Sequence, residues 1–313
     1  MGKCLITKMN GSLSGADLPV LGKIRIKLLG KTNDYHSNSQ GYIQVKNSNI
    51  EWAGEEKVNS EATGSYTIYF KQPKSGIVYC SDKYNVTSIQ TDWMYAADVK
   101  FEDLTKYCRN LTSLSLSNSG QTGDLSEIAG LKLINLSLSH SKVTGDIASL
   151  PNRYLLTSLD ISNNKTISVN TQDLSICTGL TNLDLKDSMA TGDIANLSTL
   201  TNLEKLELKD TSVSGNLSSL AGLSKLYYFT NWNLQNTWSS QDLRPSSNKI
   251  ISGEFRFATA TDTDNFLINM AKCQASERKQ IYFQQSHRTS ASDAAVSTLQ
   301  GKGYTLSQLI TDK

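Results

Sequence analysis

The stretch Leu111-Thr112-Ser113-Leu114-Ser115-Leu116 begins a pattern that returns along the middle of the chain. Leu-x-x-Leu-x-Leu, or its variant with Ile, recurs with first residues at Leu111, Leu133, Leu156, Leu180 and Leu203. A sixth segment starts at Leu226, continues with Phe229 and then departs from the pattern. Successive first residues are 22, 23, 24, 23 and 23 positions apart by subtraction, and a fixed period in the twenties is typical of a solenoid.

A second motif keeps the same period. It reads Gly123-Asp124-Leu125, Gly145-Asp146-Ile147, Gly192-Asp193-Ile194 and Gly215-Asn216-Leu217, whereas the third repeat has Ser168-Val169-Asn170 and one extra residue. Glycine permits a tight turn, and the Asp or Asn that follows can cap a short helical turn. The aspartates could also form a ladder of cation ligands, but Asn216 carries no charge at the same place, which favours capping.

The leucines define a buried face. Leu114 and Leu116 are two residues apart, so they point to the same side of a short strand. One repeat cannot bury that side alone, so neighbouring repeats must stack. Three residues after the last leucine, the repeats have Ser119, Ser141, Asn164, Ser188 and Thr211. These side chains can satisfy buried backbone groups in the turn, so we expect them to form a ladder that holds the coils together.

These motifs resemble the leucine-rich repeat family over roughly residues 104–232. The resemblance implies a solenoid with a parallel sheet, and it implies a binding role in place of catalysis. We therefore predict a mixed α/β chain with three parts. Residues 1–98 form an antiparallel β domain, a sandwich or a barrel; residues 99–232 form the solenoid; and residues 233–313 form an α/β C-terminal cap.

Composition excludes several classes of protein. The 313 residues carry a net charge of +2, which gives no electrostatic reason to bind nucleic acid or an anionic membrane. No stretch approaches the roughly 20 apolar residues of a membrane span. The five cysteines are scattered, which predicts reduced, mostly buried thiols and no disulfide framework or zinc site.

The terminal regions predict strands and helices outside the repeats. Short alternating segments separated by polar turns indicate five to seven strands before residue 92. A helix over residues 96–108 should cap the first repeat. After the repeats we expect strands at 250–257, 281–283 and 304–306 and helices at 261–273 and 290–300. Capping boxes should start the two helices at Thr261 with Asp264 and at Ser290 with Asp293.

The sequence offers no catalytic set. The three histidines lie far apart, and the chain has neither a Gly-rich phosphate loop nor a nucleophile elbow. Residues 262–265 resemble part of a calcium loop but lack its glycine and its distal glutamate, so helix capping is the better interpretation. We predict no catalytic residue, no metal ligand and no cofactor.

The outward strand positions are the candidate binding residues. Side chains that alternate with the core leucines should form columns, because neighbouring strands lie about 4.8 Å apart. An acidic column should repel itself, and a lysine column beside it should offset this repulsion. The face is then either a solvated, self-neutralised surface or a binding site for a glycan or a polar protein surface. Its candidate residues are Ser115, Ser137, Asp160, Asp184, Glu207, Lys186, Lys209 and Lys205.

Aromatic side chains follow the last repeat. Tyr227, Tyr228, Trp232 and Trp238 lie beside the predicted face in sequence. They can stack on sugar rings, or they can pack the C-terminal cap.

A second resemblance concerns both ends of the chain. Residues 1–11 and 18–22 resemble the start of virion-associated proteins of bacteriophages that infect gut bacteria, and residues 290–296 with 303–304 resemble the C-terminal end of repeat proteins from the same bacteria and their phages. The resemblance implies a phage fibre or decoration protein that binds a host-surface glycan or protein through its solenoid. Residues 1–98 would join other virion proteins, as a trimer. The N-terminal residues lack the apolar segment that would indicate a secretory signal. This agrees with assembly of a virion in the host cytoplasm. A bacterial leucine-rich repeat adhesin and an intracellular protein-binding scaffold remain alternatives.

Overall fold

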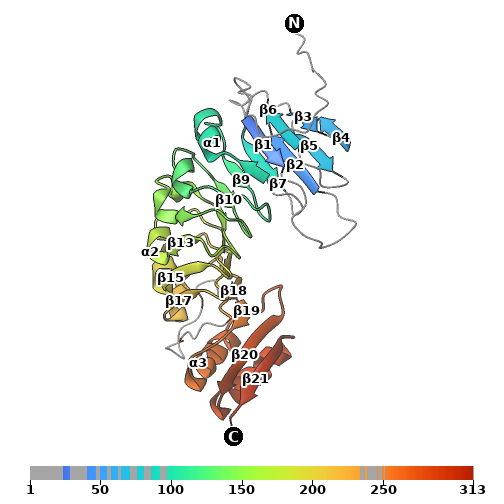
Figure 1. The fold of residues 1–313 in the computed structure, drawn as a ribbon. Coiled ribbons are helices and arrows are strands. Elements are labelled where there is room, and N and C mark those ends of the chain that lie inside the picture. The colour runs from blue at the N-terminus through green and yellow to red at the C-terminus, as the bar shows by residue number, and fades with distance from the viewer. Residues whose placement is uncertain are drawn as a thin grey trace.

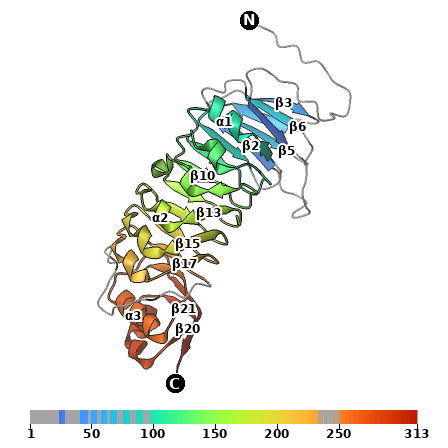
Figure 2. The same cartoon turned by 60° about the vertical axis from the view of Figure 1, so that its left-hand side comes forward.

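A computed structural model describes residues 24–28, 41–46, 50–54, 58–62, 65–70, 76–80, 86–91, 97–232 and 251–312, with the single residues 237, 245 and 249. Its main feature is a 13-stranded sheet that runs along the molecule in the order β21-β20-β19-β18-β16-β14-β12-β10-β9-β7-β2-β5-β4. Helices lie along the opposite side of the repeats, and the sheet lies on the inner side of their curve (Figures 1 and 2).

The repeats supply six parallel strands of the long sheet. They are β9 (Ser113–Ser115), β10 (Asn135–Ser137), β12 (Ser158–Asp160), β14 (Asn182–Asp184), β16 (Lys205–Glu207) and β18 (Tyr228–Thr230). The middle residue of each strand pairs with the middle residue of the next, from Leu114 to Phe229. All of these middle residues are buried. The predicted parallel solenoid is confirmed, and its core is a stack of equivalent leucines.

The other side of each coil contains short helical turns and a second parallel sheet. The turns are η2 (Leu125–Ile128), η3 (Ile147–Ser149), η4 (Arg153–Leu155), α2 (Thr171–Leu174), η5 (Ile194–Thr199) and η6 (Leu217–Gly222). The second sheet has the order β11 (Gly145–Asp146), β13 (Ile167–Asn170), β15 (Met189–Asp193) and β17 (Ser212–Ser214). Its strands were not predicted, because they are short and lack an apolar alternation.

The predicted helix caps are confirmed. In each coil the side chain of one Asp or Asn accepts a hydrogen bond from the backbone N–H two residues later, at 2.8 to 3.0 Å. The capping residues are Asp124, Asp146, Asn170, Asp193 and Asn216. Asn170 therefore keeps the cap in the third repeat, where the Gly-Asp motif is broken. The glycine before the cap is needed for its backbone, since Gly192 has a φ of 107°.

Removal of one cap should have a moderate effect on stability. We expect Asp193→Ala to lower the free energy of unfolding by about 1 kcal/mol, because the N–H of Ala195 loses its acceptor. Asp193→Asn should change stability little, since Asn216 performs the same role one coil later. Urea denaturation of both variants measures the difference, and equal loss in the two would contradict the capping role.

The polar ladder is only partly as predicted. The hydroxyls of Ser141 and Ser188 accept hydrogen bonds from N–H groups two residues later in their own coil, at 3.4 and 3.2 Å. Thr211 likewise donates to Leu208 O within its coil, at 2.8 Å. Asn164 differs, because its Nδ2 donates to Ser141 Oγ of the preceding coil at 3.0 Å. Apart from the contact between Asn164 and Ser141, this row therefore shapes the turns of single coils and does not join neighbouring coils.

The N-terminal strands form two antiparallel groups. One is a four-stranded sheet, β3 (Ile50–Gly54), β6 (Gly76–Cys80), β1 (Ile24–Leu28) and β8 (Ala97–Val99). The other joins the long sheet and contains β4 (Val58–Ala62), β5 (Ser65–Phe70), β2 (Gly41–Lys46) and β7 (Ser88–Thr91). The choice between a sandwich and a barrel for residues 1–98 stays a prediction.

The junction differs from the predicted helix over residues 96–108. The helix α1 (Phe101–Tyr107) begins later, because Ala97–Val99 is strand β8 and pairs with β1. Strand β7 pairs in parallel with β9, so Ile89 lies beside Leu114 and both are buried. The long sheet therefore passes from the N-terminal strands into the solenoid without a break.

The C-terminal strands continue the sheet of the repeats. Strands β19 (Ser252–Phe255), β20 (Gln280–Arg288) and β21 (Thr305–Thr311) are parallel to β18 and follow it in order. Between them lie α3 (Ala260–Ala271), η7 (Ser290–Ser292) and α4 (Asp293–Gly301). The predicted strand and helix units are thus present. Among the described residues, no helix has both the length and the apolar character needed to span a membrane.

The predicted capping boxes are wrong in position. Thr259 caps α3 and forms the box with Asp262, two residues before the predicted pair. Asp264 is used elsewhere, since its carboxylate accepts hydrogen bonds from Thr289 Oγ1 at 2.6 Å and Ser292 Oγ at 2.5 Å. Two overlapping Thr-x-x-Asp patterns occur in this segment, and the contact with η7 decides which of them caps the helix.

The change from the leucine pattern has a structural cause. Asn231 takes the place of the last leucine and is buried. Its Nδ2 donates to Arg256 O and its Oδ1 accepts from Arg256 N, both at 2.9 Å. The amide thus clamps β18 to the next strand, where a leucine side chain would offer no hydrogen bond.

Candidate functional site

The register of the sheet brings the predicted outward residues into columns. Ser115, Ser137, Asp160, Asp184 and Glu207 pair in this order across five strands. The same column continues through Thr230 and Glu254. We call Asp160, Asp184, Glu207 and Glu254 the acidic column. Glu254 was missed because the leucine pattern ends before β19, although Gly253 follows Phe229 by 24 residues, close to the period of the repeats.

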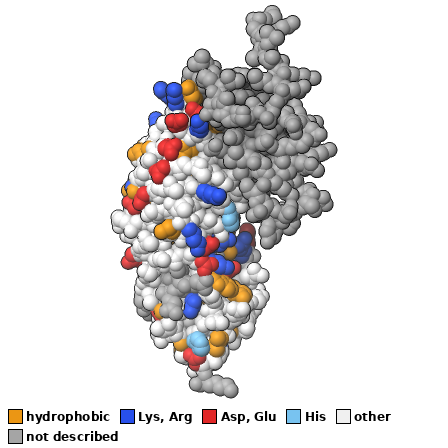
Figure 3. Space-filling model, viewed as in Figure 1, with side chains coloured by type: hydrophobic (Ala, Val, Ile, Leu, Met, Phe, Trp, Pro, Cys, Tyr) orange, Lys and Arg blue, Asp and Glu red, His pale blue; other side chains and the backbone are white. Residues whose placement is uncertain are grey.

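Basic residues stand two positions after three members of the acidic column. We call Lys186, Lys209 and Arg256 the basic column, and Trp232 interrupts it between the last two. Their backbones stay in step, since the N–H of Asp187 donates to Lys209 O at 2.8 Å and the N–H of Asp210 donates to Trp232 O at 3.0 Å. Figure 3 shows acidic and basic side chains gathered at mid-height on the right of the solenoid, above a group of hydrophobic ones.

The two columns do not pair with each other. Within the part of the chain that the structure describes, no ion pair of 4.0 Å or less joins an acidic-column residue to a basic-column residue. The basic column therefore offsets the repulsion within the acidic column only by attraction over a longer distance, without direct ion pairs. Neither column therefore neutralises the other by direct contact.

Asp184 has the most perturbed carboxyl group of the face. Burial, together with the neighbouring carboxylates of Asp160 and Glu207, raises its pKa to about 6. One hydrogen bond opposes this effect, because the N–H of Lys186 donates to Asp184 Oδ1 at 3.0 Å. Deprotonation of Asp184 therefore lowers the free energy of unfolding.

The N-terminal part of the column is internally satisfied. Asp160 accepts hydrogen bonds from Ser137 Oγ at 3.0 Å, from Ser162 N at 3.0 Å and from Ser162 Oγ at 2.7 Å. Ser137 also shares a hydrogen bond of 2.6 Å with Ser117. The candidates thus separate into a bonded group, Ser137 and Asp160, and a more open group that begins at Asp184.

The aromatic residues lie against charged groups. The ring of Trp232 has Lys209 Nζ 4.7 Å from its centroid and stacks on Tyr282 at 5.0 Å with an interplanar angle of 18°. Lys205 Nζ lies 5.9 Å from the ring of Tyr227, and the Arg278 guanidinium lies 4.4 Å from that of Tyr228. Trp238 lies outside the described residues. Trp232 is therefore enclosed by its own neighbours, as the packing interpretation expects.

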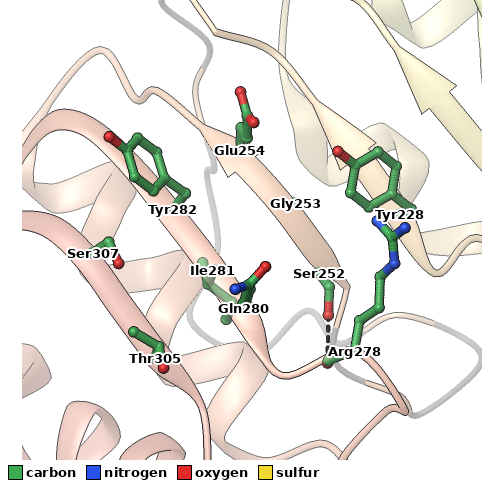
Figure 4. Close-up of a pocket in the computed structure, with 10 residues that line it drawn as sticks. All are labelled: Tyr228, Ser252, Gly253, Glu254, Arg278, Gln280, Ile281, Tyr282, Thr305 and Ser307. Atoms are coloured by element: carbon green, nitrogen blue, oxygen red, sulfur yellow. Dashed lines mark hydrogen bonds between the residues drawn. The ribbon is translucent and has the colours of Figure 1, made fainter.

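A pocket of about 300 Å³ opens on the sheet beside these aromatic residues. Tyr228 and Tyr282 stand on opposite sides of it, with Glu254 and Gln280 between them (Figure 4). The remaining lining residues are Ser252, Gly253, Arg278, Ile281, Thr305 and Ser307. The pocket lies where Ser252 on β19 and Thr305 and Ser307 on β21 have small side chains, whereas β18 and β20 carry tyrosines.

Reactive groups do not cluster in the described residues. No three His, Cys, Asp or Glu side chains there are placed to hold a metal ion. Cys108, Cys177 and Cys273 are buried and form no disulfide, and burial raises the pKa of Cys177 to about 11. A thiol with such a pKa is a poor nucleophile at neutral pH.

Comparison with known proteins completes the description. No family model matches the sequence, and a search of curated proteins found no match. Solved structures do resemble the chain. Internalin C2 of Listeria monocytogenes is 30% identical, with a TM-score of 0.37, over 44% of this chain and 56% of the internalin chain. The chain thus spans little more than half the length of internalin C2.

Two further structures extend the comparison. Internalin F of Listeria monocytogenes is 19% identical over 72% of this chain and 82% of its own, with a TM-score of 0.42. The leucine-rich repeat ectodomain of the receptor kinase SOBIR1 from Arabidopsis thaliana is 23% identical over 40% and 73%, with a TM-score of 0.32. The repeat period and the in-register parallel strands of this chain by themselves make its middle part a solenoid of leucine-rich repeats. The two charged columns lie on the sheet face of these repeats.

Proposed function

We propose that the chain is a non-enzymatic binding protein that takes a polar ligand, a glycan or a protein on a host surface, on its sheet face. The observation that supports this proposal best is the pair of parallel columns, one acidic and one basic, without ion pairs between them. Opposite charges that only stabilised the fold would be expected to pair. Charges held apart in rows can attract complementary groups and fix the orientation of a ligand.

The acidic column is not a requirement of the fold. Ser137 and Ser115 occupy the same column two and three strands before Asp184, and the sheet continues through them without change of register. The raised pKa of Asp184 means that its charge opposes folding. A destabilising charge at a position where serine suffices supports a role in binding, because functional sites often reduce stability.

We propose a phage virion as the setting, as a fibre or decoration protein whose residues 1–98 join other virion proteins. The support is the resemblance of residues 1–11 and 18–22 to virion-associated phage proteins, and of residues 290–296 with 303–304 to repeat proteins of gut bacteria and their phages. Light scattering on the full chain tests the predicted trimer. A monomeric mass would contradict it and would favour the adhesin or scaffold alternatives.

Binding to cells tests the sheet face directly. We expect the labelled full chain to bind intact cells of at least one strain in a panel of gut bacteria. The double variant Asp184→Asn/Glu207→Gln should bind about tenfold more weakly, since both charges lie on the proposed contact face. The matched control Asp146→Asn/Asp193→Asn removes the same two charges from the helix side of the coils and should bind normally. Equal binding by both variants would exclude the acidic column as the contact.

A further inference from the structure

We infer that the pocket on β18–β21 holds one neutral pyranose ring of a glycan. This inference rests on the proposed function, because it names the ligand class for one part of the sheet face. The pocket was not among the candidate sites of the sequence, and only Tyr228 of its lining residues was a candidate.

The shape of the pocket suits a flat ring. Tyr228 and Tyr282 lie on strands that are separated by β19, so these two strands are about 9.6 Å apart, twice the usual strand spacing of about 4.8 Å. The register also offsets the two tyrosines by two positions along the strands, since Tyr228 pairs with Ser252 and Tyr282 pairs with Glu254. Between them the floor is low, because Ser252 is a small residue. The volume of about 300 Å³ lies at the lower end for small-molecule pockets, which suits one sugar unit and excludes a helix or a strand.

The hydrogen-bonding groups suit vicinal hydroxyls. Among the described residues, the side chains of Glu254, Gln280, Thr305 and Ser307 have no hydrogen-bond partner. The Glu254 carboxylate can only accept, whereas the Gln280 amide and the two hydroxyls can both donate and accept. Sugar hydroxyls also donate and accept, so each can pair with one of these groups. Arg278 covers one face of the Tyr228 ring and Trp232 covers one face of the Tyr282 ring, so each tyrosine has one ring face for a ligand. The four open polar groups match the polar edge of a pyranose, and these ring faces match its apolar face.

Other ligands fit the pocket less well. A basic side chain would meet Arg278, and an acidic one would meet Glu254. An apolar group would leave the polar floor without partners, which costs free energy. Burial and the charges of Glu207 and Glu254 raise the pKa of Tyr228, so its phenol stays protonated and can donate to a sugar oxygen. A neutral polyhydroxyl ring satisfies all of these groups.

Ligand-observed saturation-transfer NMR on the full chain tests the inference. The probes are the methyl glycosides of glucose, galactose, mannose and N-acetylglucosamine. We expect at least one of them to bind with a dissociation constant in the millimolar range, which is usual for a single small ligand with few contacts. Glu254→Gln and Gln280→Ala should each weaken it about tenfold. Glu102→Gln makes the same change as Glu254→Gln on the exposed first turn of α1, at the other end of the repeats, and should bind as the parent does.

Each outcome is decisive. Absence of binding by all four glycosides would overturn the inference, as would full binding by both pocket variants. Gln280 is exposed, so its replacement by alanine keeps the test valid if Glu254→Gln fails to fold. If cells bind the protein through the acidic column and no glycoside binds, the inference fails and the proposed function stands. If neither cells nor glycosides bind, both fail.

Discussion

Replacement of Gly253 by alanine is expected to lower the free energy of unfolding by more than about 3 kcal/mol. Gly253 has a φ of 151°, which side chains rarely permit. A Cβ atom there would overlap the carbonyl oxygen of Phe229 and would lie 2.7 Å from its carbonyl carbon. Both atoms belong to the backbone of a paired strand, so no side-chain rotation relieves the contact. Thermal unfolding followed by circular dichroism measures the loss.

Gly301 provides the matched control for this prediction. It is the last residue of α4, and a Cβ atom there would have no other atom within 4 Å. Gly301→Ala should therefore leave stability unchanged or raise it by about 0.5–1 kcal/mol, the usual helix preference for alanine. A Gly253→Ala variant that melts with the parent protein would show that β18 and β19 can separate at little cost.

Asp184→Asn is expected to stabilise the protein by about 2 kcal/mol at pH 7.5. The carboxyl of Asp184 has a pKa of about 6 in the folded chain against an ordinary value of 3.8. Between these two values the folded state binds more protons than the unfolded state, so its stability falls as the pH rises from about 4 to about 6. The amide cannot ionise, and it keeps an oxygen to accept from the N–H of Lys186. The Asp184→Asn variant therefore does not undergo the loss of folding stability that the parent shows above pH 6.

The difference in melting temperature between variant and parent isolates this effect, since other groups titrate equally in both. The difference should be near zero at pH 4 and should grow to its full size by about pH 7. Asp193→Asn makes the same chemical change at a helix cap and should shift the melting temperature little at pH 7.5, because Asn216 caps equally well. A melting temperature of Asp184→Asn below that of the parent at pH 7.5 would refute the account. Together with the expected loss of cell binding, the result would show that this charge serves binding and opposes folding.

Sequence patterns predicted those parts of the fold that repeat. The leucine spacing predicted both the strands and their register, since Leu114, Leu136 and Leu159 pair as equivalent residues. The glycine and Asp or Asn motif predicted the caps for the same reason. The pairing of β7 with β9 could not be predicted, because it depends on a contact between segments that share no motif. The misplaced capping boxes have a similar cause, since Asp264 is bound by a distant segment.

The candidate site was likewise predictable from sequence only where the leucine pattern repeats. Regular alternation around the leucines located the columns as far as Glu207, and the structure places these residues side by side. Which members remain open depends on contacts such as those of Asp160 with Ser137 and Ser162, and a linear pattern does not contain them. The pocket was missed because Tyr282 and Glu254 come together through strand order after the repeat pattern has ended.

The in-register stacking of the coils makes the length of the charged face easy to change in evolution. Duplication of one repeat, such as the 23 residues from Leu180 to Asn202, would add one strand of about 4.8 Å and one residue to each column. The new coil would meet its neighbours through the same leucine and turn contacts, so neither end of the molecule would have to adapt. Gain or loss of whole repeats would therefore fit the length of the charged face to longer or shorter ligands, in steps of one strand.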